Sequence, residues 1–149
     1  MDLDPAMIAR AGRRLARFGE RVRLAQGSAT DLRHALDAED DAYDAVFDFA
    51  IIHHIPDWRS ALDEVVRVLK PGGRFIFDEV TAIALASWTY RLLFDHPEHD
   101  RFTAEQFTTA LAERGLVVGD RVVTRRGEPV PPRCRRAPPR PVGPTPYTG

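Results

Sequence analysis

Two adjacent histidines, His53 and His54, follow a nearly continuous apolar run from Ala45 to Ile52. An imidazole changes its charge near neutral pH, so either ring could act as a general base that takes a proton from a nucleophile. The alternative is structural, with the two rings shaping a pocket or packing beneath the helix that follows. We expect no metal site here, because other ligands at suitable spacing are missing.

Two adjacent carboxylates, Asp78 and Glu79, come at the end of a strand predicted over Arg74 to Asp78. Doubly wound α/β folds place their ligands at the carboxyl ends of the strands. The two carboxylates could therefore face a substrate, or they could simply be solvated. The aromatic and histidine residues between Trp88 and His99 could form a lid over such a site, although aromatic residues at helical spacing more often belong to a core.

Helices and strands are expected to alternate along the chain. Asp4 and Pro5 suit a helix start, because Asp4 can accept from unpaired N–H groups and Pro5 lacks only an N–H that has no partner there. This alternation is typical of an α/β fold with a mainly parallel sheet. Helices are predicted after Asp4, Asp57 and Thr103, and a further helix is predicted over Ala82 to Phe94. Strands are predicted over Val22 to Gln26, Ala45 to Ile52, Arg74 to Asp78 and Leu116 to Thr124.

Composition indicates a folded protein of one domain. The chain has 149 residues, of which 44% are hydrophobic and 29% charged, so wholesale disorder is excluded. Its single cysteine, Cys134, permits no internal disulfide and favours a reducing compartment. The N-terminus lacks the apolar core of a signal peptide, and Ala82 to Phe94 is too short to cross a bilayer. The sequence therefore predicts a soluble cytoplasmic protein.

The charge is distributed unevenly between two parts of the chain. Residues 1–124 hold 15 basic and 21 acidic side chains, a net charge of −6, which gives no reason to expect a nucleic-acid or membrane partner. Residues 125–149 hold six arginines against one acid and eight of the twelve prolines. We therefore predict a domain over residues 1–124 and a disordered Arg/Pro-rich tail over residues 125–149.

The segment from Tyr43 to Val80, YDAVFDFAIIHHIPDWRSALDEVVRVLKPGGRFIFDEV, resembles the second half of small-molecule, type 11-like class I S-adenosylmethionine-dependent methyltransferases. Its most specific string is Arg67 to Arg74, where a helix ends sharply and two glycines allow a tight reversal into the next strand. His53 to Asp57 is similar to a His-His-Ile/Val-x-Asp sequence frequent in these enzymes. The resemblance covers about residues 2–124 and implies a partial doubly wound Rossmann-like sheet.

The resemblance also implies S-adenosylmethionine as cofactor and assigns residues to it. Asp2 would hold the ribose hydroxyls, Ser28 and the Ala29 N–H the adenine, and the Phe49 backbone the methionine end. The acceptor would be a small-molecule O, N or C nucleophile. Two alternatives stay open: Asp2 is a terminal residue without a role, and the Ser28 hydroxyl only satisfies its own turn.

The family's first strand and its Gly-x-Gly-x-Gly loop have no counterpart in this sequence, and only Met1 to Leu3 remain of its second strand. In the family's strand order, 3-2-1-4-5-7-6, the absent strand is the central one. The fourth strand, Ala45 to Ile52, is a sequence suited to burial on both faces but is then expected to face an open edge. The third strand could detach, it could pair with the fourth, or the chain could associate with a second copy.

The run after Thr124 departs from the family as well. We expect that it cannot supply the last strand of the sheet, because proline cannot donate to a ladder. One hypothesis is that the reading frame shifts near Thr124, which a single-base correction in resequenced DNA would reveal. The other is a flexible extension whose PxxP-like pieces bind a proline-recognition domain.

Three functions are compared. The first is a methyltransferase fragment in which His53 or His54 is the catalytic base. The second is an inactive remnant or interaction module without cofactor binding, which the missing glycine loop favours. The third, an NAD-binding Rossmann domain, is disfavoured by the Leu-Lys-Pro-Gly-Gly turn and the His-His loop. An open sheet edge would also allow self-association, and the sequence leaves the oligomeric state open.

Overall fold

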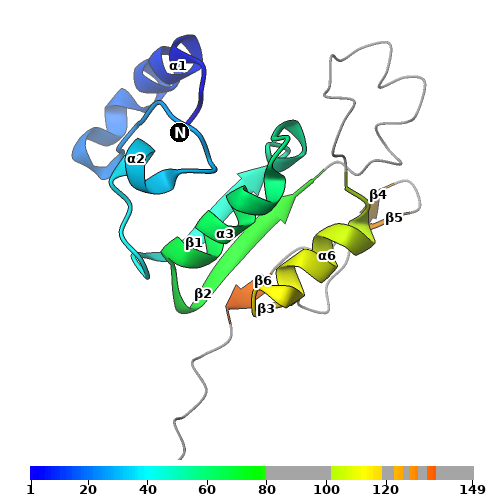
Figure 1. Ribbon diagram of the computed structural model, residues 1–149. Coiled ribbons are helices and arrows are strands. Elements are labelled where there is room, and N and C mark those ends of the chain that lie inside the picture. The colour runs from blue at the N-terminus through cyan, green and yellow to red at the C-terminus, as the bar shows by residue number, and fades with distance from the viewer. Residues whose placement is uncertain (80–101, 119–122, 126–127, 131–133, 137–149) are drawn as a thin grey trace, which may run out of the picture.

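The computed structural model describes residues 1–79, 102–118, 123–125, 128–130 and 134–136, which include a four-stranded sheet with helices packed on it (Figure 1). The helix predicted over Ala82 to Phe94 and the possible lid after it lie outside the described residues. None of the helices in the described ranges combines the length and apolar character needed to cross a membrane. In chain order the elements are α1 (Pro5–Leu15), η1 (Ala16–Arg21), α2 (Leu32–Leu36), β1 (Tyr43–Phe49), η2 (Ile52–His54), α3 (Trp58–Val68), β2 (Leu69–Asp78), α6 (Ala104–Glu113), β3 (Leu116–Val118), β4 (Val123–Arg125), β5 (Glu128–Val130) and β6 (Cys134–Arg136).

The helices begin where capping residues occur in the sequence. The Asp4 carboxylate accepts from the Ala6 N–H at 2.7 Å at the start of α1, and the Asp57 carboxylate accepts from the Ser60 N–H at the start of α3. Thr103 and Gln106 form a capping box at the start of α6, as their spacing predicts. These helix starts could be predicted because a cap depends only on local sequence.

The strand order β1-β2-β6-β3 confirms the predicted partial doubly wound sheet. β1 and β2 are parallel, with Val46 opposite Phe75 and Phe49 opposite Asp78. β6 is antiparallel to both of its neighbours, so β3 runs in the same direction as β2. This arrangement corresponds to the 4-5-7-6 portion of the family's sheet.

The pairing of β6 with the sheet contradicts one expectation from the sequence. The Arg/Pro-rich run was expected to be unable to pair with the sheet, and this is wrong: Arg135 lies opposite both Arg74 and Val117 in the ladders. The stretch Cys134–Arg136 contains no proline, so each of its residues keeps the N–H that a ladder requires. The predicted tail thus contributes β5 and β6, and residues 137–149 lie outside the described part of the chain.

The expectation of an open edge at β1 is confirmed, because β1 is the outermost strand of the sheet. The expectation that it is covered on both faces is wrong, since Phe47 and Phe49 are exposed while Asp48 is buried. The predicted strand Val22 to Gln26 is reduced to one bridge between Asp2 and Gln26. Among the three possible arrangements of the third strand, the structure shows detachment from β1.

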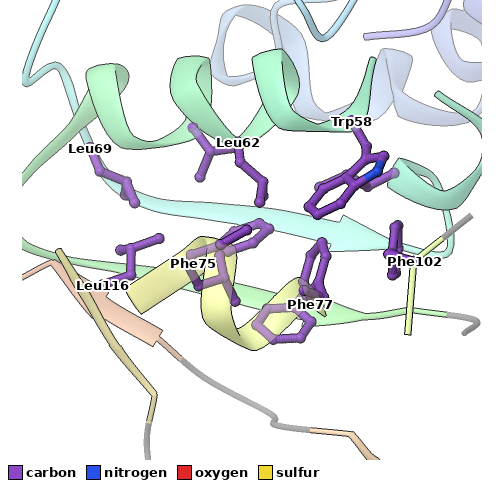
Figure 2. Packing of buried hydrophobic residues seen from close by; sticks show 12 residues of the cluster. Trp58, Leu62, Leu69, Phe75, Phe77, Phe102 and Leu116 are labelled. Carbon is purple, nitrogen blue, oxygen red and sulfur yellow. The ribbon is translucent and has the colours of Figure 1, made fainter. Parts of the chain in front are cut away.

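The core lies on one face of the sheet, between β2, α3 and α6 (Figure 2). Phe75 and Phe77 of β2 point into it, and the Phe77 ring meets Phe107 of α6 edge-on at 5.1 Å. Trp58 begins α3 and lies 5.0 Å from the Phe102 ring. Packing of aromatic side chains from distant segments therefore holds both helices on the same face of the sheet.

Arg67 connects the N-terminal segment to α3. Its guanidinium donates to both carboxylate oxygens of Glu64, at 2.6 and 2.7 Å, and to the Asp40 carboxylate at 2.7 Å. The Glu64 carboxylate also accepts from the Leu32 N–H at the start of α2, at 2.7 Å. The Leu32 side chain packs with Val68, which lies on α3 together with Glu64 and Arg67. This Arg67 cluster (Asp40, Glu64 and Arg67) fixes α2 against the sheet domain.

Replacing Arg67 by methionine should destabilise the fold by roughly 1–2 kcal/mol at neutral pH, because the part-buried Glu64 loses two charge-assisted hydrogen bonds. The hydrogen bonds from Arg67 hold the pKa of the Glu64 and Asp40 carboxyls below their usual range. Carboxyl groups with a lowered pKa stabilise the fold above their unfolded pKa of roughly 4, and this contribution is lost as pH falls through the folded pKa.

The difference in unfolding free energy between wild type and Arg67→Met should therefore narrow as the pH falls from 6 to 3, as measured by urea denaturation. Arg13→Met, at an exposed arginine of α1, serves as the control and should change stability by less than about 0.5 kcal/mol. A difference that does not change with pH would contradict this account of the Arg67 cluster.

Candidate functional site

The carboxyl ends of β1 and β2 are joined by the carboxylate of Glu79. Its Oε1 accepts from the N–H groups of Ile51 at 2.9 Å and Ile52 at 2.7 Å. Its Oε2 accepts from the His53 N–H at 3.2 Å and lies 2.7 Å from His53 Nδ1. Parallel strands bring their carboxyl ends to the same edge of a sheet, so a residue ending β2 can reach the loop after β1.

His53 is enclosed by this arrangement. Its side chain is 4% exposed and that of Glu79 is 2% exposed. Burial lowers the pKa of His53. Because the Glu79 carboxylate is an acceptor of N–H groups, we assign the proton of a neutral imidazole to Nδ1. His53 therefore fits the structural alternative better than the role of a base that meets substrate directly.

Asp48 is a third titratable group in the same buried cluster, and the sequence analysis did not select it. Its Oδ1 accepts from the Ile51 N–H at 3.2 Å, while Oδ2 is buried without a hydrogen-bond partner. Burial, together with the neighbouring Glu79 carboxyl, raises the pKa of Asp48 to about 9. Asp48 thus keeps its proton at neutral pH, and the cluster avoids holding two buried charges side by side. A lone acid inside an apolar strand was the sequence signal that could have identified it.

His54 lies at the surface, unlike His53. Its ring packs against the His53 ring with centroids 4.1 Å apart and planes at 37°. The two adjacent carboxylates also differ in their exposure to solvent. Glu79 is buried beneath the loop after β1, whereas Asp78 is exposed. Of the two predicted base candidates, His54 is the exposed one and His53 the buried one.

The residues predicted to hold adenosine lie close to one another. The Asp2 N–H donates to Ala25 O at 3.3 Å, and the Gly27 N–H donates to Asp2 O at 3.0 Å. Asp2 is therefore placed beside the turn that contains Ser28 and Ala29. Its Oδ1 accepts from the Asp4 N–H at 2.9 Å, which leaves Oδ2 available to a hydroxyl group.

Ser28 behaves as the alternative interpretation predicts. Its hydroxyl lies 2.7 Å from the Thr30 hydroxyl and accepts from the Thr30 N–H at 3.2 Å. The Ala29 N–H makes no hydrogen bond to any residue that the structure describes. The turn after the bridge between Asp2 and Gln26 therefore presents the Ala29 N–H, while its serine hydroxyl is already paired.

Phe49 ends β1 and has an exposed side chain. Its register partner is Asp78, so its backbone lies at the carboxyl edge where doubly wound folds bind their ligands. No hydrogen bond between described residues joins Phe49 to Asp2 or Ser28. The structure therefore brings the ribose and adenine residues together and leaves the methionine-end residue on a different element.

Comparisons with known proteins agree with the fold and the sequence patterns. The model of the methyltransferase domain family matches residues 1–77, about half of the chain. The demethylmenaquinone methyltransferase of Clavibacter sepedonicus is 38% identical over 78 residues, which cover 52% of this chain and 30% of that protein. A ubiquinone/menaquinone biosynthesis C-methyltransferase of Methylobacterium nodulans is 34% identical over 124 residues, which cover 81% of this chain and 43% of that protein.

Among solved structures, phosphoethanolamine N-methyltransferase 2 of Haemonchus contortus, in complex with phosphomonomethylethanolamine and S-adenosylhomocysteine, is similar with a TM-score of 0.62. The identity is 22%, and the match covers 78% of this chain and 27% of that one. At this identity the similarity shows a shared fold. The chain spans less than half the length of each of these relatives.

The variant Glu79→Gln tests whether the hydrogen bonds of the Glu79 carboxylate to the loop after β1 stabilise the fold. An amide keeps the shape but replaces one acceptor oxygen by an NH₂ group, which must face backbone N–H donors. We expect a loss of about 1–3 kcal/mol in unfolding free energy, the usual cost of a buried polar group without a partner. Urea denaturation at pH 7 measures it.

Asp78→Asn is the matched control, because Asp78 directly precedes Glu79 at the end of β2 and is exposed. It should change stability by less than about 0.5 kcal/mol. Equal losses for the two variants would show that Glu79 has no special structural role.

Proposed function

Because this chain belongs to the methyltransferase domain family, we propose that it carries part of the S-adenosylmethionine site of a methyltransferase that acts on a small-molecule O, N or C nucleophile. The observation that supports the proposal is the bridge between Asp2 and Gln26, after which the chain enters the turn that contains Ser28 and Ala29. When bound, S-adenosylmethionine supplies a methyl group on a positively charged sulfur. The residues of this chain bind and orient it.

At the adenosine end, Asp2 Oδ2 would accept a hydrogen bond from a ribose hydroxyl, and the Ala29 N–H would donate to the adenine ring. A charged acceptor makes the stronger hydrogen bond of these two. Ser28 adds less than an acid at the same position, because its hydroxyl already pairs with Thr30. Binding at this end therefore depends mainly on Asp2.

At the acceptor end, His54 would take the proton that an O or N nucleophile loses as the methyl group arrives. The neutral His53 ring packs against the His54 ring, with 4.1 Å between centroids, and does not repel the positive charge that His54 would gain. Glu79 in turn fixes the loop through three N–H groups and the His53 ring. Glu79 and His53 thus act as positioning residues.

A second candidate function is an interaction module or inactive remnant that binds no cofactor. One observation favours it: the Ser28 hydroxyl is occupied by its own turn. Direct measurement of cofactor binding separates the two functions.

Titration of S-adenosylhomocysteine into the purified chain by calorimetry should give saturable binding. Asp2→Ala should weaken it about tenfold or more, because a charge-assisted hydrogen bond contributes roughly 1.5–3 kcal/mol. Glu20→Ala, at another exposed acid of the N-terminal segment, should leave the affinity unchanged.

Thermal protection by S-adenosylhomocysteine but not by NAD would distinguish this site from a dinucleotide site. A folded sample that binds neither ligand would support the second candidate function and end the enzyme proposal for this chain.

His54→Ala tests the proposed base. In an assay of S-adenosylhomocysteine release with small phenols and amines as acceptors, the variant should be slower by about 10²–10⁴-fold. His34→Ala, at an exposed histidine of α2, should retain the wild-type rate. If His54→Ala retains the wild-type rate, His54 is not the base, and the loop contributes only to the alignment of the nucleophile.

A further inference from the structure

The turn that presents the Ala29 N–H is shaped by its own residues. The Ser28 hydroxyl accepts from the Thr30 N–H at 3.2 Å, and the Asp31 N–H donates to Ser28 O at 3.2 Å. These hydrogen bonds join near neighbours in the chain, so they set the shape of the turn. The position of the turn relative to β1 and β2 depends instead on contacts with more distant residues.

The helix α2 follows the turn directly and packs closely against it. Asp31 caps α2, because its carboxylate accepts from the His34 N–H at 3.0 Å. A Cβ on Gly27 would lie 2.3 Å from the Ala35 Cβ and 3.1 Å from the Ala35 Cα. α2 thus approaches the backbone at Gly27 so closely that only glycine leaves room for it. The turn and α2 cannot shift past each other, so whatever holds α2 also holds the turn.

Glu64 of α3 holds α2 at its first residue. Its Oε2 accepts from the Leu32 N–H at 2.7 Å and from Arg67 Nη2 at 2.7 Å, while its Oε1 accepts from Arg67 Nε at 2.6 Å. The Glu64 side chain is 16% exposed, so these hydrogen bonds are largely shielded from water. A guanidinium that donates to both oxygens fixes the orientation of a carboxylate. Arg67 therefore keeps Glu64 directed at the start of α2.

Arg67 also holds the segment that follows α2. Its Nη1 donates to Ala38 O at 2.9 Å and to the Asp40 carboxylate at 2.7 Å. The side chains of Leu32, Ala38 and Val68 form one buried apolar cluster. α2 is thus bound to α3 at its first residue, shortly after its last residue and through its apolar side. The position of α2 is therefore determined by α3.

Building on the proposed function, we propose that Glu64 is a positioning residue of the cofactor site, which holds the turn with the Ala29 N–H where the adenine ring binds. Glu64 acts through α2 and does not touch the cofactor. Leu62 and Val65 of the same helix pack in the core with Phe75 of β2. Glu64 therefore ties the adenine end of the cofactor to the strands that carry the methionine and acceptor ends.

The variant Glu64→Gln tests this role, with Asp63→Asn as its matched control. An amide has one acceptor oxygen, and its NH₂ group would face the donors of Arg67 or Leu32, so α2 is held less firmly. Asp63 is adjacent on α3 and also pairs with an arginine, but its partner is Arg114 at the end of α6, at 2.6 Å. The two variants therefore remove similar charges on opposite sides of one helix.

Calorimetric titration of S-adenosylhomocysteine should give a dissociation constant about tenfold higher for Glu64→Gln, as expected if the turn keeps its binding position about a tenth of the time. Amide hydrogen exchange without ligand should become faster at residues 27–36 and stay unchanged in α6, because only the α2 segment opens more often. Asp63→Asn should change neither the affinity nor the exchange at residues 27–36. Circular dichroism at the same temperature verifies that each variant is folded.

The variant Gly27→Ala tests the same contact from the turn without changing a charge. The added Cβ would push Ala35 and α2 away from the turn, so the dissociation constant should rise at least about threefold. Gly12→Ala is the control, because a Cβ on Gly12 would lie 3.7 Å from Leu24 Cδ1, an ordinary contact. It should bind S-adenosylhomocysteine with the wild-type affinity.

Wild-type affinity in Glu64→Gln or Gly27→Ala, or unchanged exchange at residues 27–36 in Glu64→Gln, would overturn the positioning role and leave the proposed function in place. A wild-type chain that binds no S-adenosylhomocysteine would instead overturn the proposed function, and the role of Glu64 in cofactor binding with it.

Discussion

The buried carboxylate of Glu79 is the constraint on which the site depends. It accepts from three consecutive N–H groups of the loop after β1, and it orients the His53 ring. The left-handed Ala50 and the short η2 helix turn the chain so that these N–H groups converge. Without this acceptor the N–H groups of Ile52 and His53 would be buried donors without partners, each costing about 1–3 kcal/mol. The side chain that directly follows β2 therefore fixes the end of β1 and the loop after it.

Local sequence was enough to predict the helix starts, and the resemblance to the family predicted that β1 and β2 are neighbours. Asp4, Asp57 and Thr103 cap helices where expected, because a cap involves only residues a few positions apart. The Arg67 to Arg74 string identified the family, and the family's order placed β1 beside β2 at an open edge. These features depend on short-range rules or on a resemblance that spans one contiguous segment.

Long-range features could not be predicted in the same way. The partners of Glu79 lie 26 to 28 residues away, and whether it faced solvent or a loop depended on how the strands register. Apolar composition suggested a β1 covered on both faces, but composition does not say whether a covering layer is present. β6 was missed because prolines surround it, although three proline-free residues are enough to pair with two neighbours.

The two ends of the proposed cofactor site depend on different interactions. Phe49 lies opposite Asp78 at the carboxyl end of β1, and the loop that follows it is held by the Glu79 carboxylate. Asp2 is held instead by its bridge to Gln26, and the Gly27 N–H donates to Asp2 O. A change at Glu79 therefore acts on the loop after β1, whereas a change at Asp2 acts on the turn that contains Ser28 and Ala29. Because no described hydrogen bond joins these two regions, the relative position of the two ends depends on how α2 packs against α3, through the hydrogen bonds of Glu64 and Arg67.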